Sequence, residues 1–211
     1  ETDIFKLAFS TKGGSITELS LRKYPTSLKQ PKDYIEMLNI SESAYFGYQN
    51  GLAGNENLPT HNSIYTLDSI TPEDELKDGK TPLEVIFNHT KNGVSVKKVY
   101  TIQPGSYLIN VAYSIKNNSS SSVAVYNYEQ LKRKVMSSRN GLIYTYAGAV
   151  FSTPDKRFEK YDFDDVVSWP ASATSHLDYV IDSNDTGTRD ESQASLKIEK
   201  SFTENLSSHQ I

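Results

Sequence analysis

The sequence predicts an all-β protein, an antiparallel β-sandwich, and three observations support this prediction. Apolar and polar residues alternate along most of the chain from Ile4 to Phe151, which is the period of strands that are half buried in a sheet. Pro25, Pro31 and five further prolines fall between the alternating runs, where a missing amide proton breaks no ladder bond. No helical period extends over more than a few turns.

The first predicted strands form a hairpin around two adjacent glycines. Residues 5–9 alternate and lead into the turn Thr11-Lys12-Gly13-Gly14, after which residues 15–21 continue as the next strand. A second hairpin combines residues 83–87 with residues 94–102. Its connection contains Asn92-Gly93, a pair that readily adopts the positive φ angles of a tight hairpin turn.

A third hairpin follows, and its first strand shows the clearest alternation in the chain. Five residues of 107–116 share one face, while polar residues occupy the other: Tyr107, Ile109, Val111, Tyr113 and Ile115. Asn117-Asn118 and four serines have the composition of a turn. The β-branched and aromatic run at residues 123–128 then returns as the partner strand.

One short helix is expected near residues 154–162. Thr153 suits its N-cap, and Pro154 suits the first helical position, where its missing N–H would be unpaired anyway. Phe158 and Tyr161 are three residues apart and would meet on one face of this helix.

The composition divides the chain into a sandwich domain at 1–165 and a polar tail at 166–211. Between residues 182 and 211 the only aromatic residue is Phe202, among many Ser, Asn, Asp and Glu residues. We expect this tail to be poorly ordered, because it has little apolar surface to offset the entropy of ordering. Tyr179-Val180-Ile181 is the one stretch of this tail that suits a short strand.

The charge and the residue types argue against several classes of function. A net charge of −4 argues against a nucleic-acid-binding protein, and the basic run at 132–134 alternates between the two faces of a strand. The chain has no cysteine, and its four histidines show no metal-binding spacing, so we expect no metal and no cofactor. No apolar run approaches the ~18 residues that cross a bilayer.

We expect no catalytic residue, although two alternatives to a binding module stay open. A sugar-binding or sugar-processing protein of the mutarotase type would need a histidine acid and a carboxylate base at one cleft. His61, His89 and Glu129 are the candidates, and nothing in the sequence pairs them. A secreted adhesive β-sandwich is the other alternative, since sequons such as Asn39-Ile40-Ser41 occur.

Several blocks of sequence resemble the large periplasmic domain of Gram-negative YidC membrane-protein insertases. The specific block is Gly-Ala-Val-Phe-Ser-Thr-Pro-Asp at 148–155, which continues to Glu-Lys-Tyr at 159–161. Residues 7–16, 48–52 and 107–117 resemble further blocks in the family's order. The resemblance covers about residues 1–165, whereas 166–211 departs from it.

This resemblance implies a sandwich of the galactose-mutarotase-like (supersandwich) type and a non-catalytic role. The domain would assist insertion and folding of inner-membrane proteins as a docking or scaffold module, on the periplasmic face of the bacterial inner membrane. Implied partners are SecD and SecF of the Sec translocon and substrate membrane proteins, and the parent protein would be anchored in the membrane. The implied partner-binding residues are Phe151, Thr153, Pro154, Phe158, Tyr161 and Phe163.

Overall fold

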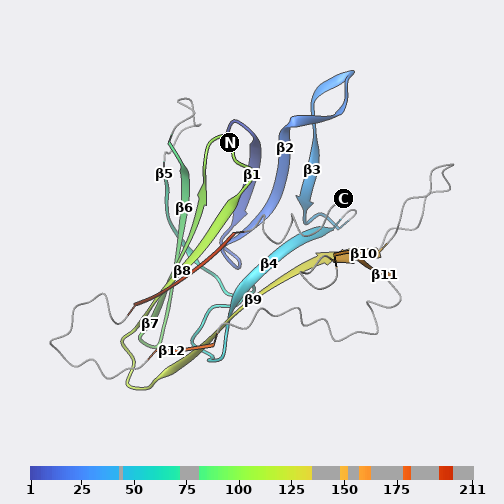
Figure 1. Ribbon diagram of the computed structural model, residues 1–211. Helices are drawn as coiled ribbons and strands as arrows, with labels where there is room; N and C mark the ends of the chain where they lie inside the picture. The colour runs from blue at the N-terminus through green and yellow to red at the C-terminus, as the bar shows by residue number, and fades with distance from the viewer. Residues whose placement is uncertain are drawn as a thin grey trace.

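Two antiparallel sheets face each other across one apolar interior in the computed structural model of this protein (Figure 1). The structure describes residues 1–42, 45–71, 81–134, 148–151, 157–162, 178–181 and 195–201. This arrangement confirms the predicted β-sandwich. In the part of the chain that the structure describes, we find no apolar helix of the length that a bilayer crossing requires.

The first sheet has the strand order β1-β2-β3-β4-β9-β12, and the second has the order β13-β8-β7-β6-β5. A separate pair, β10-β11, forms a small third sheet. The strands are β1 (Phe5–Ser10), β2 (Ser15–Ser27), β3 (Gln30–Asn39), β4 (Phe46–Ala53), β5 (Thr66–Thr71), β6 (Leu83–Lys91), β7 (Val94–Ile102), β8 (Ile109–Asn117), β9 (Val123–Arg133), β10 (Gly148–Phe151), β11 (Glu159–Asp162), β12 (Asp178–Ile181) and β13 (Ser195–Ser201).

The alternation read from the sequence sets which face of each strand is buried. On β8 the four residues predicted to share a face with Tyr107 are at most 3% exposed: Ile109, Val111, Tyr113 and Ile115. On β7 the inward positions are Val94, Val96, Lys98, Tyr100 and Ile102. The β6–β7 turn adopts positive φ at Asn92 (48°) and Gly93 (82°), as predicted for an Asn-Gly hairpin.

Pro25 and Pro31 lie inside strands, which corrects the prediction that they fall between them. Pro25 stands opposite Tyr34 in the β2–β3 ladder, at a point where the register shifts on both sides. Pro31 is the second residue of β3. Both positions are consistent with a residue that cannot donate to a ladder, because irregularities and strand ends require fewer backbone donors.

Residues 159–162 of the helix expected near 154–162 form a strand instead. Glu159–Asp162 forms β11 and pairs with β10 in the register Phe151 to Glu159 and Gly148 to Asp162. Residues 152–156, which include the expected N-cap, lie outside the described residues. The three-residue spacing of Phe158 and Tyr161 was insufficient evidence for a helix, because a four-residue strand is specified by its non-local partner.

Two segments of the polar tail are strands that extend the two sheets. β12 pairs with β9, which confirms the strand expected at Tyr179-Val180-Ile181. β13 pairs with β8 over seven residues, from Ser195 opposite Lys116 to Ser201 opposite Asn110. The remainder of 166–211 lies outside the described residues.

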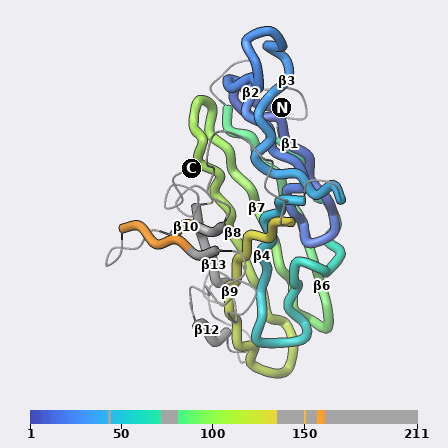
Figure 2. Tube along the Cα trace, turned by 90° about the vertical axis from the view of Figure 1, so that its right-hand side faces the viewer, coloured from blue at the N-terminus to red at the C-terminus, as the bar shows by residue number. Residues whose placement is uncertain are grey.

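β3 and β4 are neighbours in the first sheet but share a single residue pair, Asn39 with Phe46. From that pair β3 runs back along β2, whereas β4 pairs with β9 along its whole length. The β2–β3 hairpin therefore rises above the body of the sandwich, as Figures 1 and 2 both show. The point where the two strands separate leaves a hollow on the surface.

Candidate partner-binding site

Of the six predicted partner-binding residues, five lie partly or wholly outside the residues whose side chains the structure describes. Phe151 ends β10 and Tyr161 lies in β11, opposite Ala149. Thr153, Pro154 and Phe163 are outside the described residues. The sixth, Phe158, immediately precedes β11 and is described in full.

Phe158 is a large apolar side chain held in solvent. It is 63% exposed, and the Nζ atom of Lys160 lies 5.2 Å from the centre of its ring. Figure 2 shows the orange segment around residues 157–160, where β11 begins, projecting away from the two sheets. A projecting aromatic residue beside a cation is typical of the residues that anchor protein interfaces, where aromatic and cationic side chains are enriched.

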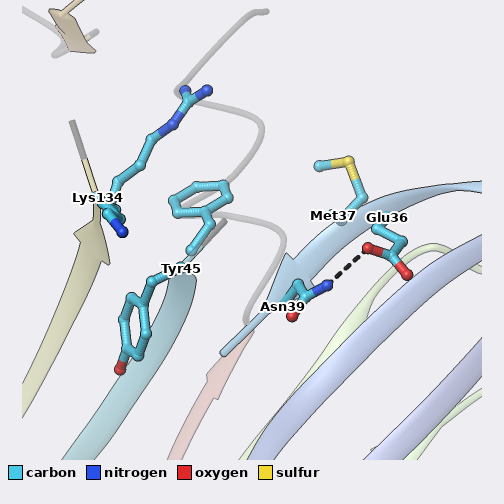
Figure 3. Close-up of a pocket in the computed structure, with 7 residues that line it drawn as sticks. Glu36, Met37, Asn39, Tyr45 and Lys134 are labelled. Atoms are coloured by element: carbon cyan, nitrogen blue, oxygen red, sulfur yellow. Dashed lines mark hydrogen bonds between the residues drawn. The ribbon is translucent and has the colours of Figure 1, made fainter. Parts of the chain in front are cut away.

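A second candidate surface is the hollow at the point where β3 and β4 separate, which we call the β3–β4 groove. Its volume is about 170 Å³, and its lining comes from β3, the start of β4 and the end of β9: Glu36, Met37, Asn39, Tyr45, Phe46, Arg133 and Lys134. Figure 3 shows Met37 and Glu36 on one side and Tyr45 and Lys134 on the other. The lining thus combines thioether and aromatic surface with both signs of charge.

The charged residues of the groove are held in place by neighbours. Asn39 Nδ2 donates to Glu36 Oε2 over 2.7 Å, as drawn in Figure 3. Lys134 Nζ donates to the carbonyl oxygen of Glu42 over 2.8 Å. The Arg133 guanidinium lies 5.5 Å from the centre of the Phe46 ring. This end of β9 therefore presents exposed cations beside aromatic rings.

The sequence contained no signal for this groove. Its residues come from positions about a hundred apart in the chain, and they meet only because β9 pairs with β4 and β4 touches β3 at one pair. By contrast, Lys98 was visible in the sequence as a charged residue at an inward position of the β7 alternation.

Lys98 forms a fully buried polar cluster between the sheets. Its Nζ atom donates to the carbonyl oxygen of Gly13 over 2.9 Å and to Asn50 Oδ1 over 2.6 Å. The same Nζ atom lies within 6 Å of three aromatic ring centres, those of Tyr65, Tyr100 and Tyr113. Burial lowers the pKa of Lys98 well below its ordinary value, while the nearby Glu129 carboxylate acts in the opposite direction.

This cluster connects structural elements and has no opening among the described cavities. Tyr100 Oη donates to the carbonyl oxygen of Gly14 over 2.8 Å, so two residues of β7 hold the Gly13-Gly14 turn. Burial raises the pKa values of Tyr48, Tyr100 and Tyr113 well above their ordinary value. These tyrosines are therefore neutral at physiological pH, and the cluster holds the sandwich together through the hydrogen bonds of Lys98 and Tyr100.

The residues required by a mutarotase-type site do not come together. His61 Nδ1 lies 2.7 Å from Tyr128 Oη, and His89 Nδ1 lies 3.1 Å from the carbonyl oxygen of Ile64. Glu129 interacts with Tyr48. Burial, with Lys12 and Lys132 nearby, lowers the pKa of His61. The described residues contain no group of three or more His, Asp or Glu side chains arranged to hold a metal ion.

Comparison with known proteins agrees with the family resemblance found in the sequence. The family model described as the YidC periplasmic domain matches residues 1–180, which is beyond residue 165, where the resemblance was expected to end. A protein of Methylococcus capsulatus named membrane protein insertase YidC is 31% identical over 183 residues, covering 85% of this chain and 33% of that protein. The proteins of the same name from Methylobacillus flagellatus and Haemophilus influenzae are 33% and 30% identical, each over 79% of this chain.

The chain spans about a third of the length of these relatives. The match covers β1 to β9 and the β10–β11 hairpin, whereas β13 lies beyond its end. This chain therefore belongs to the family of YidC periplasmic domains, which lie on the periplasmic face of the inner membrane.

Proposed function

We propose that this domain is a non-catalytic docking module that assists the insertion and folding of inner-membrane proteins by binding components of the Sec translocon, SecD and SecF. The observation that carries the proposal is the exposed Phe158, on a segment that projects from the sandwich at the start of β11. A binding role needs an apolar anchor that leaves solvent when the partner arrives, and Phe158 offers most of its ring for that purpose.

The polar interior supports a role without bond-making chemistry. His61, His89 and Glu129, the groups a general acid and base would need, have separate partners. The buried Lys98 has both a carbonyl and an amide acceptor and is closed off from solvent. These residues stabilise the sandwich, and partner binding takes place on its outer surface.

The Sec proposal is tested by binding of purified SecDF, in detergent, to this immobilised domain. Phe158→Ser is expected to weaken binding at least 10-fold, because the lost ring no longer fills a site on the partner. Tyr126→Ser is the matched control, since Tyr126 is also an exposed aromatic residue (38%) but lies on β9. Thermal melting of both variants should stay within about 2 °C of the native chain.

Two results would contradict this proposal. If the native domain did not bind SecDF, SecDF would not be its partner. Equal losses of SecDF binding in Phe158→Ser and Tyr126→Ser would show that the surface around Phe158 is not the contact. Double substitution of Phe158 and Tyr161 by Ala extends the test to β11. A large fall in melting temperature for that double variant would assign these rings to packing.

We further propose that the β3–β4 groove receives an extended, partly apolar segment of a substrate membrane protein. Met37, Tyr45 and Phe46 offer adaptable and aromatic surface, and Arg133 adds a cation beside it. On the groove side, β3 pairs with a described strand only at Asn39, so its backbone is available for a further strand.

The groove proposal is tested with a photoreactive benzoylphenylalanine in place of Met37 and, as control, in place of Ile64. Ile64 is 65% exposed and is not part of the groove. Crosslinks to a nascent inner-membrane protein are expected from position 37 and not from position 64. Equal crosslinking from both positions would show nonspecific contact and would contradict the proposal.

A further inference from the structure

The β2–β3 hairpin ends in an apolar side chain that is almost completely exposed. The last pair of its ladder is Ser27 with Gln30, so Leu28 and Lys29 alone form the turn. Leu28 is 97% exposed, more than any other large apolar residue in the described part of the chain. Both views show this tip as the most distant point of the hairpin from the body of the sandwich (Figures 1 and 2).

The choice of Leu at this position has no local explanation. Two-residue hairpin turns favour Gly, Asn and Asp, which reach positive φ at low cost. Neither Leu28 nor Lys29 has positive φ; among the described residues, Asn92 is the only non-glycine residue that does. Leu28 therefore contributes neither to turn formation nor to the interior, and its side chain is available to an apolar environment outside the protein.

The side chains behind the tip follow the order of a bilayer interface. Lys29 is in the turn, and the exposed Lys32 lies on the adjoining strand. Tyr24, 50% exposed, and the partly buried Tyr34 lie further from the tip, on the two strands of the hairpin. Apolar side chains enter the hydrocarbon boundary of a bilayer, tyrosines lie at the headgroup level, and lysines bind anionic headgroups.

One acidic residue belongs to the same region and is engaged within the hairpin. Asp33 Oδ2 accepts a hydrogen bond from Thr26 Oγ1, a bond between the two strands. Further from the tip, Lys23 Nζ lies 3.9 Å from Asp3 Oδ2. The tip itself, residues 27–32, thus carries two positive charges and no negative charge, although the chain as a whole has a net charge of −4.

We propose that the tip of the β2–β3 hairpin is a membrane-contact site for anionic phospholipid. Leu28 inserts at the headgroup–acyl boundary, while Lys29 and Lys32 bind lipid phosphates. The charge complementarity of the tip and the position of this family at a membrane face select a lipid surface as the partner. This site lies apart from Phe158 and from the β3–β4 groove, so it goes beyond the proposed function and is tested independently.

Insertion is tested with tryptophan as a reporter, because the chain contains a single native tryptophan. In a Trp169→Phe background, Leu28→Trp places the only indole at the tip. Vesicles of phosphatidylethanolamine and phosphatidylglycerol (3:1) are expected to shift its emission to the blue, and brominated lipids to quench it. Pure phosphatidylcholine vesicles should do neither. An unchanged emission spectrum with the anionic vesicles would overturn the proposal.

Sedimentation with the same vesicles tests the native side chains. Leu28→Ser and the pair Lys29→Glu with Lys32→Glu are each expected to lower the bound fraction at least fivefold at low salt, and added salt should weaken native binding. Ile64→Ser is the matched control, since Ile64 is also exposed (65%) but lies elsewhere. Unchanged circular dichroism and melting confirm that each variant folds.

Three outcomes would count against the lipid assignment. An equal loss of vesicle binding in Ile64→Ser would show general surface adhesion. Equal binding to phosphatidylcholine vesicles would show that the lysines do not select anionic lipid. Loss of SecDF binding in Leu28→Ser with vesicle binding intact would identify the tip as a protein contact. The first two results leave the Phe158 proposal untouched, so the proposals fail separately.

Discussion

Lys98 on β7 donates a hydrogen bond to Asn50 on β4 across the interior, with 2.6 Å between Nζ and Oδ1. The two residues belong to opposite sheets, and the same Nζ atom also binds the Gly13 carbonyl oxygen of the β1–β2 turn. One side-chain amino group therefore joins three segments that are far apart in the sequence. Burial of this amino group is tolerated because two hydrogen-bond acceptors and three aromatic faces replace its hydration.

Lys98→Ala should lower the free energy of unfolding by about 3–5 kcal/mol, because it leaves a cavity and two buried acceptors without their donor. Denaturant unfolding followed by circular dichroism measures this change. The adjacent Lys97→Ala is the control, since Lys97 is exposed and its removal should cost less than about 0.5 kcal/mol. Equal effects of the two substitutions would contradict the structural role of Lys98.

Stability should decrease as the pH falls below about 6.5, in part because of His61. Burial lowers the pKa of His61 in the folded chain, so the unfolded chain takes up a proton at a higher pH than the folded one. The contribution of His61 to stability is therefore fully present above the pKa of His61 in the unfolded chain, and it is lost as the pH falls through the lower pKa of the folded chain. Unfolding midpoints at pH 7.5 and 5.5 should differ less in His61→Gln than in the native chain; an unchanged difference would exclude this residue as a cause.

Raising the pH above about 10 should unfold the protein cooperatively. Tyr48, Tyr100 and Tyr113 have pKa values raised by burial, so they stay protonated in the folded chain where the unfolded chain ionises. Their contribution is present below the unfolded pKa and is lost as the pH rises through the folded one. Absorbance at 295 nm should show late tyrosines ionising together with the loss of circular dichroism, and ionisation of all fourteen tyrosines in an intact fold would contradict this.

Gly51→Ala should destabilise the protein by about 1–3 kcal/mol through overpacking. A Cβ atom at Gly51 would lie 2.6 Å from Tyr128 Oη and 2.9 Å from the backbone nitrogen of His61. Tyr128 cannot easily withdraw, because its hydroxyl accepts a hydrogen bond from that same nitrogen over 2.9 Å. Gly47→Ala is the control, since its nearest neighbour is the Tyr45 hydroxyl at 3.0 Å, and a larger loss there would contradict the packing argument.

The parts of the fold that the sequence predicts are those specified by local pattern. β7 and β8 alternate along their whole length, β6 and β9 alternate over their first five residues, and Asn92-Gly93 encodes its own turn. β3 was missed because its first half is charged and polar, so its strand conformation depends on the ladder to β2. β11 was mistaken for part of a helix because four residues carry too little periodicity to distinguish the two.

The candidate sites also differ in whether a local sequence pattern could predict them. Phe158 could be proposed from sequence, because the resemblance drew attention to its block and its neighbours are polar. The β3–β4 groove could not, since it exists only where three strands meet around the Asn39–Phe46 pair. Leu28 gave no periodic signal at all; its exposure follows from the length of the hairpin and the position of its turn.

The single pair between β3 and β4 has a mechanical consequence for the whole chain. The N-terminal three strands are held to the rest chiefly by apolar side chains such as Ile4, Ile16 and Leu38, which enter the common interior. A polypeptide cut at residues 40–45 would yield two fragments with complementary apolar faces. Few backbone hydrogen bonds between strands would have to re-form across the cut. Such fragments would recombine by burial, which makes this connection the natural point at which to split or permute the domain.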